Sequence, residues 1–230
     1  MRFHGVTPRE PWAYSRYAVS VYKFYAWLRE NLLKYSVHTA EEAHKTGIPM
    51  MRPLPMVFPK DKEAVYWEDE YFYGSDLLAA PVHQEGEKRR IYFPSGSWIN
   101  LLDFRKMVGG NRIFQVDVPI DKIPVYIREG ACILSVMNGE LQLGQSMTYE
   151  KKNTVLMSRA LNETSGKRYA DGKEIEYNIL GKTGEDFFML RHAFETEFIV
   201  LLGFDRKPES LELNGISLPE GASLNALNYG

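Results

Sequence analysis

The chain has 230 residues, of which 44% are apolar and 25% are charged, so it can form one or two globular domains with a real core. Its formal net charge of −2 argues against nucleic-acid binding and against a polybasic membrane patch, because both need a basic surplus. The single cysteine, Cys132, excludes an internal disulfide, and its apolar neighbours indicate a buried, inert thiol. We find neither a secretory signal nor an apolar run of about 18 residues, which favours a cytoplasmic protein without a membrane span.

The chain opens with the stretch MRFHGVTPREPW. Arg2 and His4 alternate around Phe3, so on a strand both polar side chains would project from the same face. Pro11 suits the first turn of a helix, and we expect Trp12 to anchor the start of that helix in the core.

An apolar stripe predicts a helical segment over residues 12–46. Its members recur at three- and four-residue steps and are Tyr14, Tyr17, Val21, Phe24, Leu28 and Leu32. Thr39 and Glu42 offer a capping box as a second start signal, and Gly47 ends the segment. The pattern therefore indicates one long helix, or two helices broken near Ser36.

After residue 47 the chain changes to short aromatic and β-branched runs separated by turn residues. Runs such as EYFYGSDLLAAPV, RRIYFPSGSWINLL and RIFQVDVPIDKIPVYI predict an antiparallel β-sandwich. We expect its core to bury Tyr92, Phe93, Trp98 and Tyr126. Similar runs beyond the MNGE stretch predict a second, smaller β-domain. The predicted divisions of the chain are residues 1–49, 50–136 and 137–230.

No pattern in the sequence calls for a metal or a cofactor, and we expect none. His38 and His44 are six residues apart on the predicted helix, which is the wrong spacing for a shared metal and indicates surface positions. Asp69 and Glu70 are neighbours whose side chains point apart on a strand or turn. The stretch YWEDEY around them is expected to be a solvated turn.

The order of these motifs resembles the C-terminal part of glycoside hydrolase family 31, the α-glucosidase and α-xylosidase family. MRFHGVTPREPW is similar to the family's arginine–X–histidine motif, and GIPMMRPL resembles a family signature that follows a barrel helix. YFYGSDLLAAPV, IYFPSGSWINL and IPVYIREGACI resemble successive parts of its proximal β-sandwich, and RYADGKEIEYNIL resembles a turn of its distal domain. The resemblance covers roughly residues 1–180.

The resemblance implies both a fold and a site. Residues 1–49 would supply the last strand and helix units of a (β/α)8 barrel, followed by two antiparallel β-sandwich domains. In this family two Asp residues carry out retaining glycoside hydrolysis at the C-terminal face of the barrel. His4 would contact sugar hydroxyls in the −1 subsite, and Arg2 would support or flank it. Both catalytic Asp residues are expected to lie before Met1, so this chain alone is predicted to be inactive.

Two functions stay open on the sequence. The first is the C-terminal portion of a retaining α-glycosidase that acts on an α-linked glucoside or xyloside. Its missing catalytic region, or a second copy of the chain, would pack against residues 12–46. The second is a non-catalytic β-sandwich module that binds carbohydrate or another protein. A barrel helix needs the rest of the barrel to cover its apolar stripe, whereas a self-contained module buries that stripe on its own sheets.

Overall fold

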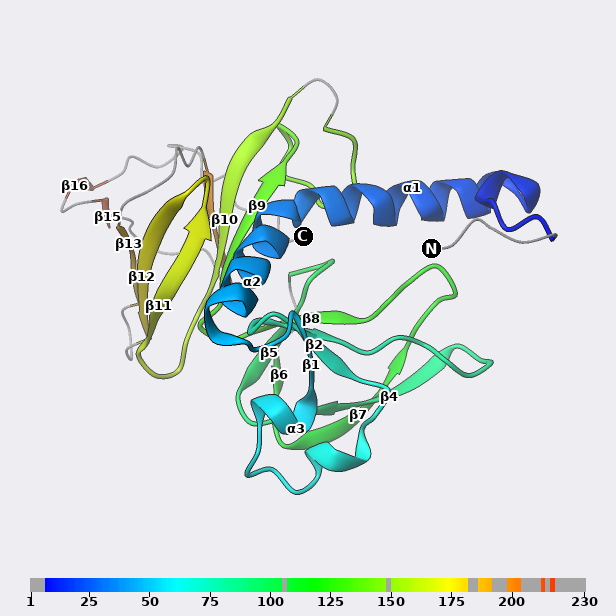
Figure 1. Cartoon of the computed structure of the whole chain (residues 1–230), viewed down its shortest axis with the longest axis horizontal. Helices are drawn as coiled ribbons and strands as arrows, with labels where there is room; N and C mark the ends of the chain where they lie inside the picture. Colours follow the sequence, from blue (N-terminus) through cyan, green and yellow to red (C-terminus); the bar gives the residue numbers. More distant parts are fainter. Residues whose placement is uncertain are drawn as a thin grey trace.

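The computed structural model describes residues 7–104, 107–147, 150–181, 186–191, 198–203, 212–213 and 216–217. A 3-10 helix, η1 (Pro11–Ala13), precedes α1 (Arg16–Asn31) and α2 (Leu33–Thr46), which meet at an angle (Figure 1). The helical segment breaks at Leu32, so the predicted break near Ser36 is wrong. Leu32 takes up φ −91° and ψ 12°, and this turn redirects the chain while the Leu32 side chain stays buried.

The ends of the helical segment are capped by different residues than predicted. The Ser15 hydroxyl accepts a hydrogen bond from the Ala18 N–H at 3.0 Å, which satisfies one of the open donors of α1. Thr39 lies inside α2, where its hydroxyl donates to the Ser36 carbonyl at 2.9 Å, so the predicted capping box is wrong. A second helix cap at Thr39 is not needed, because α2 continues almost directly from α1. Gly47 ends α2 as predicted, in the left-handed region at φ 76°.

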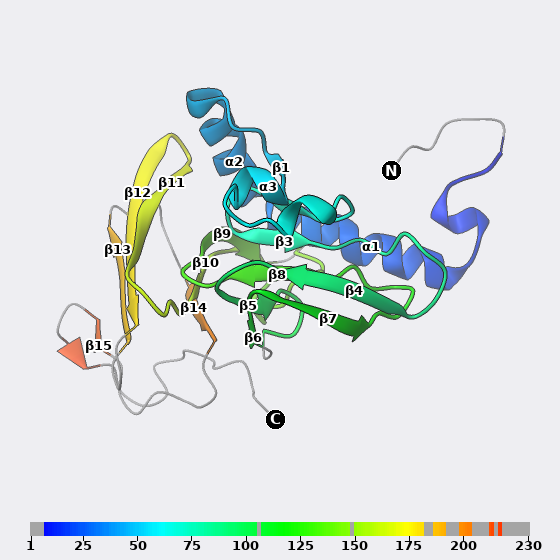
Figure 2. The ribbon, with the colours of Figure 1, turned by 90° about the horizontal axis from the view of Figure 1, so that it is seen from below.

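The first β region is an antiparallel sandwich (Figure 2). Its larger sheet has six strands in the order β1-β2-β3-β8-β5-β6, and the ribbon β4-β7 packs against it. The strands are β1 (Met51–Pro53), β2 (Tyr71–Tyr73), β3 (Leu77–Ala79), β4 (Lys88–Phe93), β5 (Ser97–Asn100), β6 (Met107–Gly109), β7 (Arg112–Asp117) and β8 (Val125–Arg128). Two short helices, α3 (Leu54–Val57) and η2 (Ala64–Tyr66), join β1 to β2. Tyr92, Phe93, Trp98 and Tyr126 are buried, which confirms the predicted core.

The second β region contains two three-stranded sheets and a short ribbon. The sheets have the orders β14-β10-β9 and β11-β12-β13, and the ribbon pairs β15 with β16. The strands are β9 (Cys132–Met137), β10 (Lys152–Ser158), β11 (Thr164–Ala170), β12 (Lys173–Gly181), β13 (Asp186–Arg191), β14 (Phe198–Leu202), β15 (Glu212–Leu213) and β16 (Ile216–Ser217). β10 and β14 run parallel, and β9 pairs with β10 although the predicted division at residue 136 assigns it to the first β-domain.

Buried side chains gather in three cores, and successive residues of a strand alternate between two of them. In β3, Leu77 enters a central core and Leu78 enters the core of the first sandwich. In β9, Ile133 enters the same central core and Leu134 enters the core of the second β region. Both faces of these sheets are therefore covered, which explains why the strands are continuously apolar in sequence.

Tyr35 and Asp76 tie α2 to both β regions through a buried polar joint with Arg168. The Arg168 guanidinium donates to Asp76 Oδ2 at 2.6 Å and to the Cys132 carbonyl at 2.7 Å. The Asp76 backbone N–H donates to the Tyr35 hydroxyl at 3.1 Å, and that hydroxyl donates to the Tyr73 carbonyl at 2.9 Å. Because Arg168 and Asp76 are each less than a tenth exposed, each needs the other to offset the loss of water.

Within the part of the chain that the structure describes, every helix is too short or too polar to cross a membrane. The central core instead takes up the end of α1 and the start of α2, through Leu28, Leu32 and Tyr35. The end of α1 and the start of α2 are therefore integrated into the β regions.

Candidate functional site

The two predicted site residues, Arg2 and His4, lie outside the described residues. Their placement at a sugar subsite stays a prediction. The structure does describe the chain from Thr7 onward, which carries the segment immediately next to them.

The turn from Pro8 to Tyr14 leads into α1. The Tyr14 hydroxyl donates to the Pro8 carbonyl at 3.2 Å, and Pro11 is buried at the start of η1. Trp12, by contrast, is 70% exposed, so the prediction that it anchors the core is wrong. The tight turn places the proline ring in the buried position and directs the indole outward.

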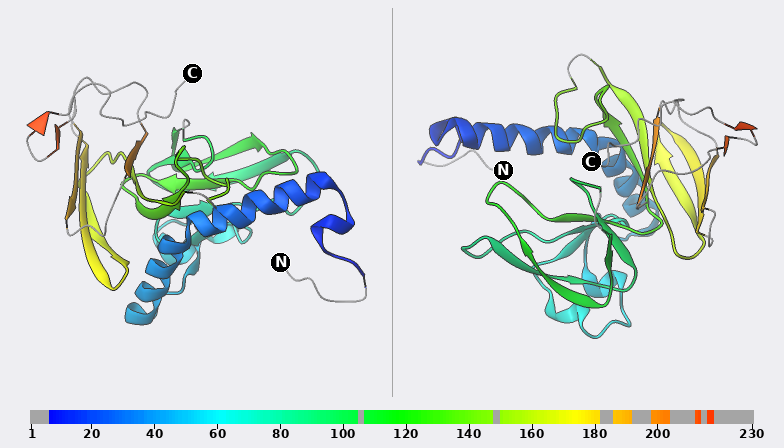
Figure 3. Two further views of the ribbon diagram at one scale, coloured as in Figure 1. Left: turned by 90° about the horizontal axis from the view of Figure 1, so that it is seen from above. Right: turned by 180° about the vertical axis from the view of Figure 1, so that it is seen from behind.

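The apolar stripe of α1 changes from exposed to buried along the helix. Tyr17 is 56% exposed in the first turn of α1, whereas Leu28 in its last turns is 6% exposed. Figure 3 shows the reason, since the beginning of α1 extends past the β regions and its end lies against them. We call Trp12, Tyr14 and Tyr17 the projecting end. Three exposed aromatic side chains on one helix start form an apolar surface of the kind that binds a protein partner.

The loop between β7 and β8 contacts α1 near the start of its buried part. The Tyr25 hydroxyl donates to the Asp121 carbonyl at 3.0 Å and accepts from the Ile123 N–H at 2.7 Å. Desolvation, and then the charge and hydrogen bond of Asp121, raise the pKa of Tyr17. Ile120 in the same loop is almost fully exposed, so the loop extends the apolar surface instead of covering it.

The acidic side chains of the described residues can be compared with what a metal ion requires. Among the residues that the structure describes, no three His, Cys, Asp or Glu side chains come together in a way that could hold a metal ion. The carboxylates that the sequence places next to each other have structural partners. Glu42 pairs with Arg52, and Asp69 pairs with Arg89 at 2.9 Å. These two carboxylates therefore have ion-pair partners within the fold.

Two buried ionisable groups were not predicted from the sequence. His38 is 2% exposed, not a surface residue, and its Nδ1 accepts from the Tyr169 N–H at 3.2 Å. Burial, followed by the positive charge of Arg168, Arg52 and Lys45, lowers the pKa of His38 to about 3. It escaped prediction because helical spacing alone does not reveal that β11 packs over this face of α2.

Glu70 is likewise buried, at 1% exposure, so the predicted solvated turn is wrong at this position. Its Oε1 accepts from the Tyr92 N–H at 3.0 Å, and burial raises its pKa to about 8. His44 and Cys132 behave as predicted, because His44 is exposed and the Cys132 thiol is buried, which raises its pKa to about 12.

Comparison with known proteins gives a consistent match. Residues 47–133 match the glycosyl hydrolase family 31 C-terminal domain. The chain is 28% identical over 215 residues to an isomaltosyltransferase from Sporosarcina globispora, covering 91% of this chain and 20% of that protein. It is 33% identical over 136 residues to an α-xylosidase from Saccharolobus solfataricus, covering 58% of this chain and 18% of that protein.

The fold matches solved structures over nearly the whole chain. A family 31 dextranase from Flavobacterium johnsoniae, complexed with isomaltotriose, superposes with a TM-score of 0.78 at 25% identity, covering 94% of this chain and 29% of the other. The chain thus spans about a fifth of the length of the curated relatives it matches.

Proposed function

The chain carries the C-terminal domain of glycoside hydrolase family 31, and we propose that it forms the C-terminal portion of a retaining α-glycosidase. The match over residues 47–133, inside a fold shared with a dextranase of that family, carries the proposal. The relatives include glycosidases and a glycosyltransferase, which supports α-glucosidic or α-xylosidic bonds as the class of substrate.

In this proposal the helical segment belongs to a catalytic (β/α)8 barrel. The projecting end and the exposed Ile120 would pack against earlier barrel units, which explains why aromatic side chains lie in water here. β1 supports this arrangement because it is an edge strand of the six-stranded sheet, paired antiparallel to β2 along one side. Its other side can accept a barrel neighbour.

In this proposal the chain helps to position the sugar and supplies neither of the two catalytic carboxyl groups. Retaining hydrolysis needs two carboxyl groups about 5–5.5 Å apart, one as nucleophile and one as acid and base. The adjacent carboxylates Glu41 and Glu42 form ion pairs with Lys45 and Arg52 and so serve the fold. His4 would donate or accept a hydrogen bond at the sugar bound in the −1 subsite, with Arg2 holding it in place. The two Asp residues would come from the earlier barrel units.

The alternative, a self-contained module that binds carbohydrate or protein without catalysis, has partial support. The end of α1 and the start of α2 do pack on the chain's own sheets, through Leu28, Leu32 and Tyr35. The exposure of the projecting end favours the glycosidase portion, because earlier barrel units would cover these three aromatic side chains, which the chain's own β regions leave in water.

Activity assays test this function. The chain alone should not hydrolyse aryl α-glucosides or α-xylosides. A chimera in which this chain replaces the matching fifth of the S. globispora isomaltosyltransferase should be active and should lose activity on His4→Ala. Turnover by the chain alone that is abolished by His4→Ala would contradict the proposal, and so would a folded chimera that His4→Ala leaves unchanged.

A further inference from the structure

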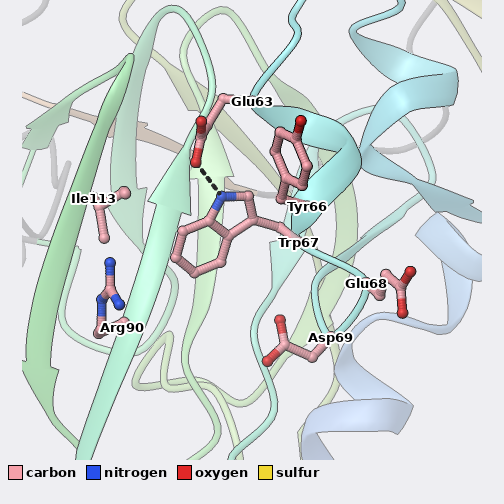
Figure 4. Close-up of a pocket in the computed structure, with 7 residues that line it drawn as sticks. All are labelled: Glu63, Tyr66, Trp67, Glu68, Asp69, Arg90 and Ile113. Carbon is pink, nitrogen blue, oxygen red and sulfur yellow. Dashed lines mark hydrogen bonds between the residues drawn. The ribbon is translucent and has the colours of Figure 1, made fainter.

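A depression on the outer side of the first sandwich has not been assigned a role. It lies where η2 and the turn after it cover the ribbon β4-β7, and it is a shallow, open depression of about 450 Å³ (Figure 4). Trp67 lies at its centre, with its indole directed toward Arg90 of β4 and Ile113, while the Glu68 side chain points away from the indole.

Trp67 is held rigidly by its neighbours. Its ring stacks on Tyr92 with a centroid distance of 5.8 Å and an interplanar angle of 17°. Its Nε1–H donates to Glu63 Oε1 at 3.2 Å, and the Tyr92 hydroxyl donates to Asp61 Oδ2 at 2.5 Å. The Glu63 N–H donates to the other Asp61 oxygen at 3.0 Å, so Asp61 fixes both supports of the indole. A rigid aromatic wall binds a ligand without a large cost in ordering.

Polar groups around this indole are left available. Among the described residues, the Tyr66 hydroxyl, the Glu68 carboxylate and the Arg90 guanidinium make no hydrogen bond or ion pair. Arg90 lies 5.9 Å from the centroid of the Trp67 ring. Asp69, also in the lining, is already used by Arg89 and His83. One strong donor, Arg90, therefore lies beside a flat apolar surface, with the Tyr66 hydroxyl and the Glu68 carboxylate farther out in the lining.

This combination selects a class of ligand. An anion is disfavoured, because Glu63, Glu68 and Asp69 outnumber Arg90 in the lining. A cation is disfavoured as well, because Arg90 already lies within cation–π range of the Trp67 ring. A neutral ring that carries apolar C–H groups on its faces and hydroxyls at its edge matches all the groups present. We propose that the depression binds a neutral saccharide, with one pyranose ring against Trp67 and its hydroxyls within reach of Arg90.

Indole NMR tests the proposal on the 230-residue chain. The chain has four tryptophans, so the ¹⁵N–¹H spectrum shows four indole signals that single Trp→Phe variants assign. Isomaltotriose, chosen because the proposed function acts on α-linked glucosides, should shift the Trp67 signal to saturation and leave Trp12, Trp27 and Trp98 in place. Because the titration measures binding without turnover, its failure would not affect the proposed function.

Three variants decide the assignment. Tyr66 and Arg90 are exposed, so Tyr66→Ala and Arg90→Gln should keep the fold, and Arg90→Gln should weaken binding about tenfold. Trp12→Ala, which removes an exposed indole elsewhere, should leave the affinity unchanged. An unshifted Trp67 signal at about 10 mM isomaltotriose would overturn the proposal. So would a saturable shift by tetramethylammonium without one by isomaltotriose, or equal affinity in the parent and in Arg90→Gln.

Discussion

The two halves of the helical segment carry the same apolar pattern and meet opposite environments. At the end of α1 and in α2, Leu28, Leu32 and Tyr35 lie in the central core against both β regions. At the projecting end, Tyr14 and Tyr17 continue the same stripe into water. The contrast shows that an apolar stripe specifies which face of a helix packs against another surface. It does not say whether that partner lies in the same 230 residues.

The largest effect should come from breaking the buried polar joint between Arg168 and Asp76. This joint holds the docked half of the helical segment, by which we mean the end of α1 together with α2. Arg168→Met leaves the Asp76 carboxylate buried without its partner at 2.6 Å, which should lower the free energy of unfolding by about 3–5 kcal/mol. Urea unfolding measures this loss. Asp76→Leu combined with Arg168→Met should recover part of it, because no charge then stays buried alone. A loss below about 1 kcal/mol in Arg168→Met would show that the joint does not hold the docked half.

The docked half should also lose stability in acid, through His38. Its pKa is lowered from 6.5 to about 3 by burial, followed by Arg168, Arg52 and Lys45. Between these values the unfolded chain binds a proton that the folded chain does not, so stability is lost as the pH falls through this window. The loss should be on the order of a few kcal/mol.

Urea unfolding at a series of pH values, on the parent and on His38→Asn, isolates this contribution. The amide side chain introduced by this substitution would keep an acceptor for the Tyr169 N–H and lack the titrating ring. The variant should show a clearly shallower fall in stability between neutral and acid pH. Parallel curves for the two proteins would contradict the assignment to His38.

A smaller effect should mark the boundary between the two halves. Tyr25→Phe removes the hydroxyl that links α1 to the Asp121 carbonyl and the Ile123 N–H. The free energy of unfolding should fall by about 0.5–1.5 kcal/mol, the usual net contribution of such bonds. Thermal unfolding of the parent and of Tyr25→Phe checks this. If Tyr25→Phe costs nothing, the loop does not restrain α1.

The smallest effect on stability should come from the projecting end itself. Tyr17→Ala should change the free energy of unfolding by less than about 0.5 kcal/mol, because the side chain is mostly in water. The same substitution should reduce self-association of the chain, since it removes part of an exposed apolar surface. Analytical ultracentrifugation of both proteins measures the second effect. A strongly destabilised Tyr17→Ala would place this residue in the docked half.

Sequence periodicity predicts most of the β architecture and the place of the helices. It succeeds for Trp98 and Phe93 because a large aromatic side chain in an alternating strand has few stable positions other than the core. It fails for Glu70 and His38, since burial of a polar side chain depends on which distant strand covers it. The stretch YWEDEY is polar in sequence, and only the fold reveals that Arg89 of β4 lies beneath it.

The two candidate sites also differ in how much of each can be predicted from the sequence. The resemblance to family 31 assigns roles to Arg2 and His4, which lie outside the described residues, so the structure adds no geometry there. The depression around Trp67 could not be predicted, because Arg90 is separated from Trp67 by more than twenty positions and lies near it only because the turn after η2 packs against β4.

Hydrogen exchange along the helical segment tests the central claim most directly. If α1 projects from the chain's own structure, amides of residues 19–23 should exchange through local opening, much faster than amides of residues 32–39. Amides of residues 32–39 should exchange only with global unfolding, as should those of β9 and β10. Equal protection of the two helical stretches in a dilute monomer would contradict the account. It would show that the chain covers its own stripe and is a complete module.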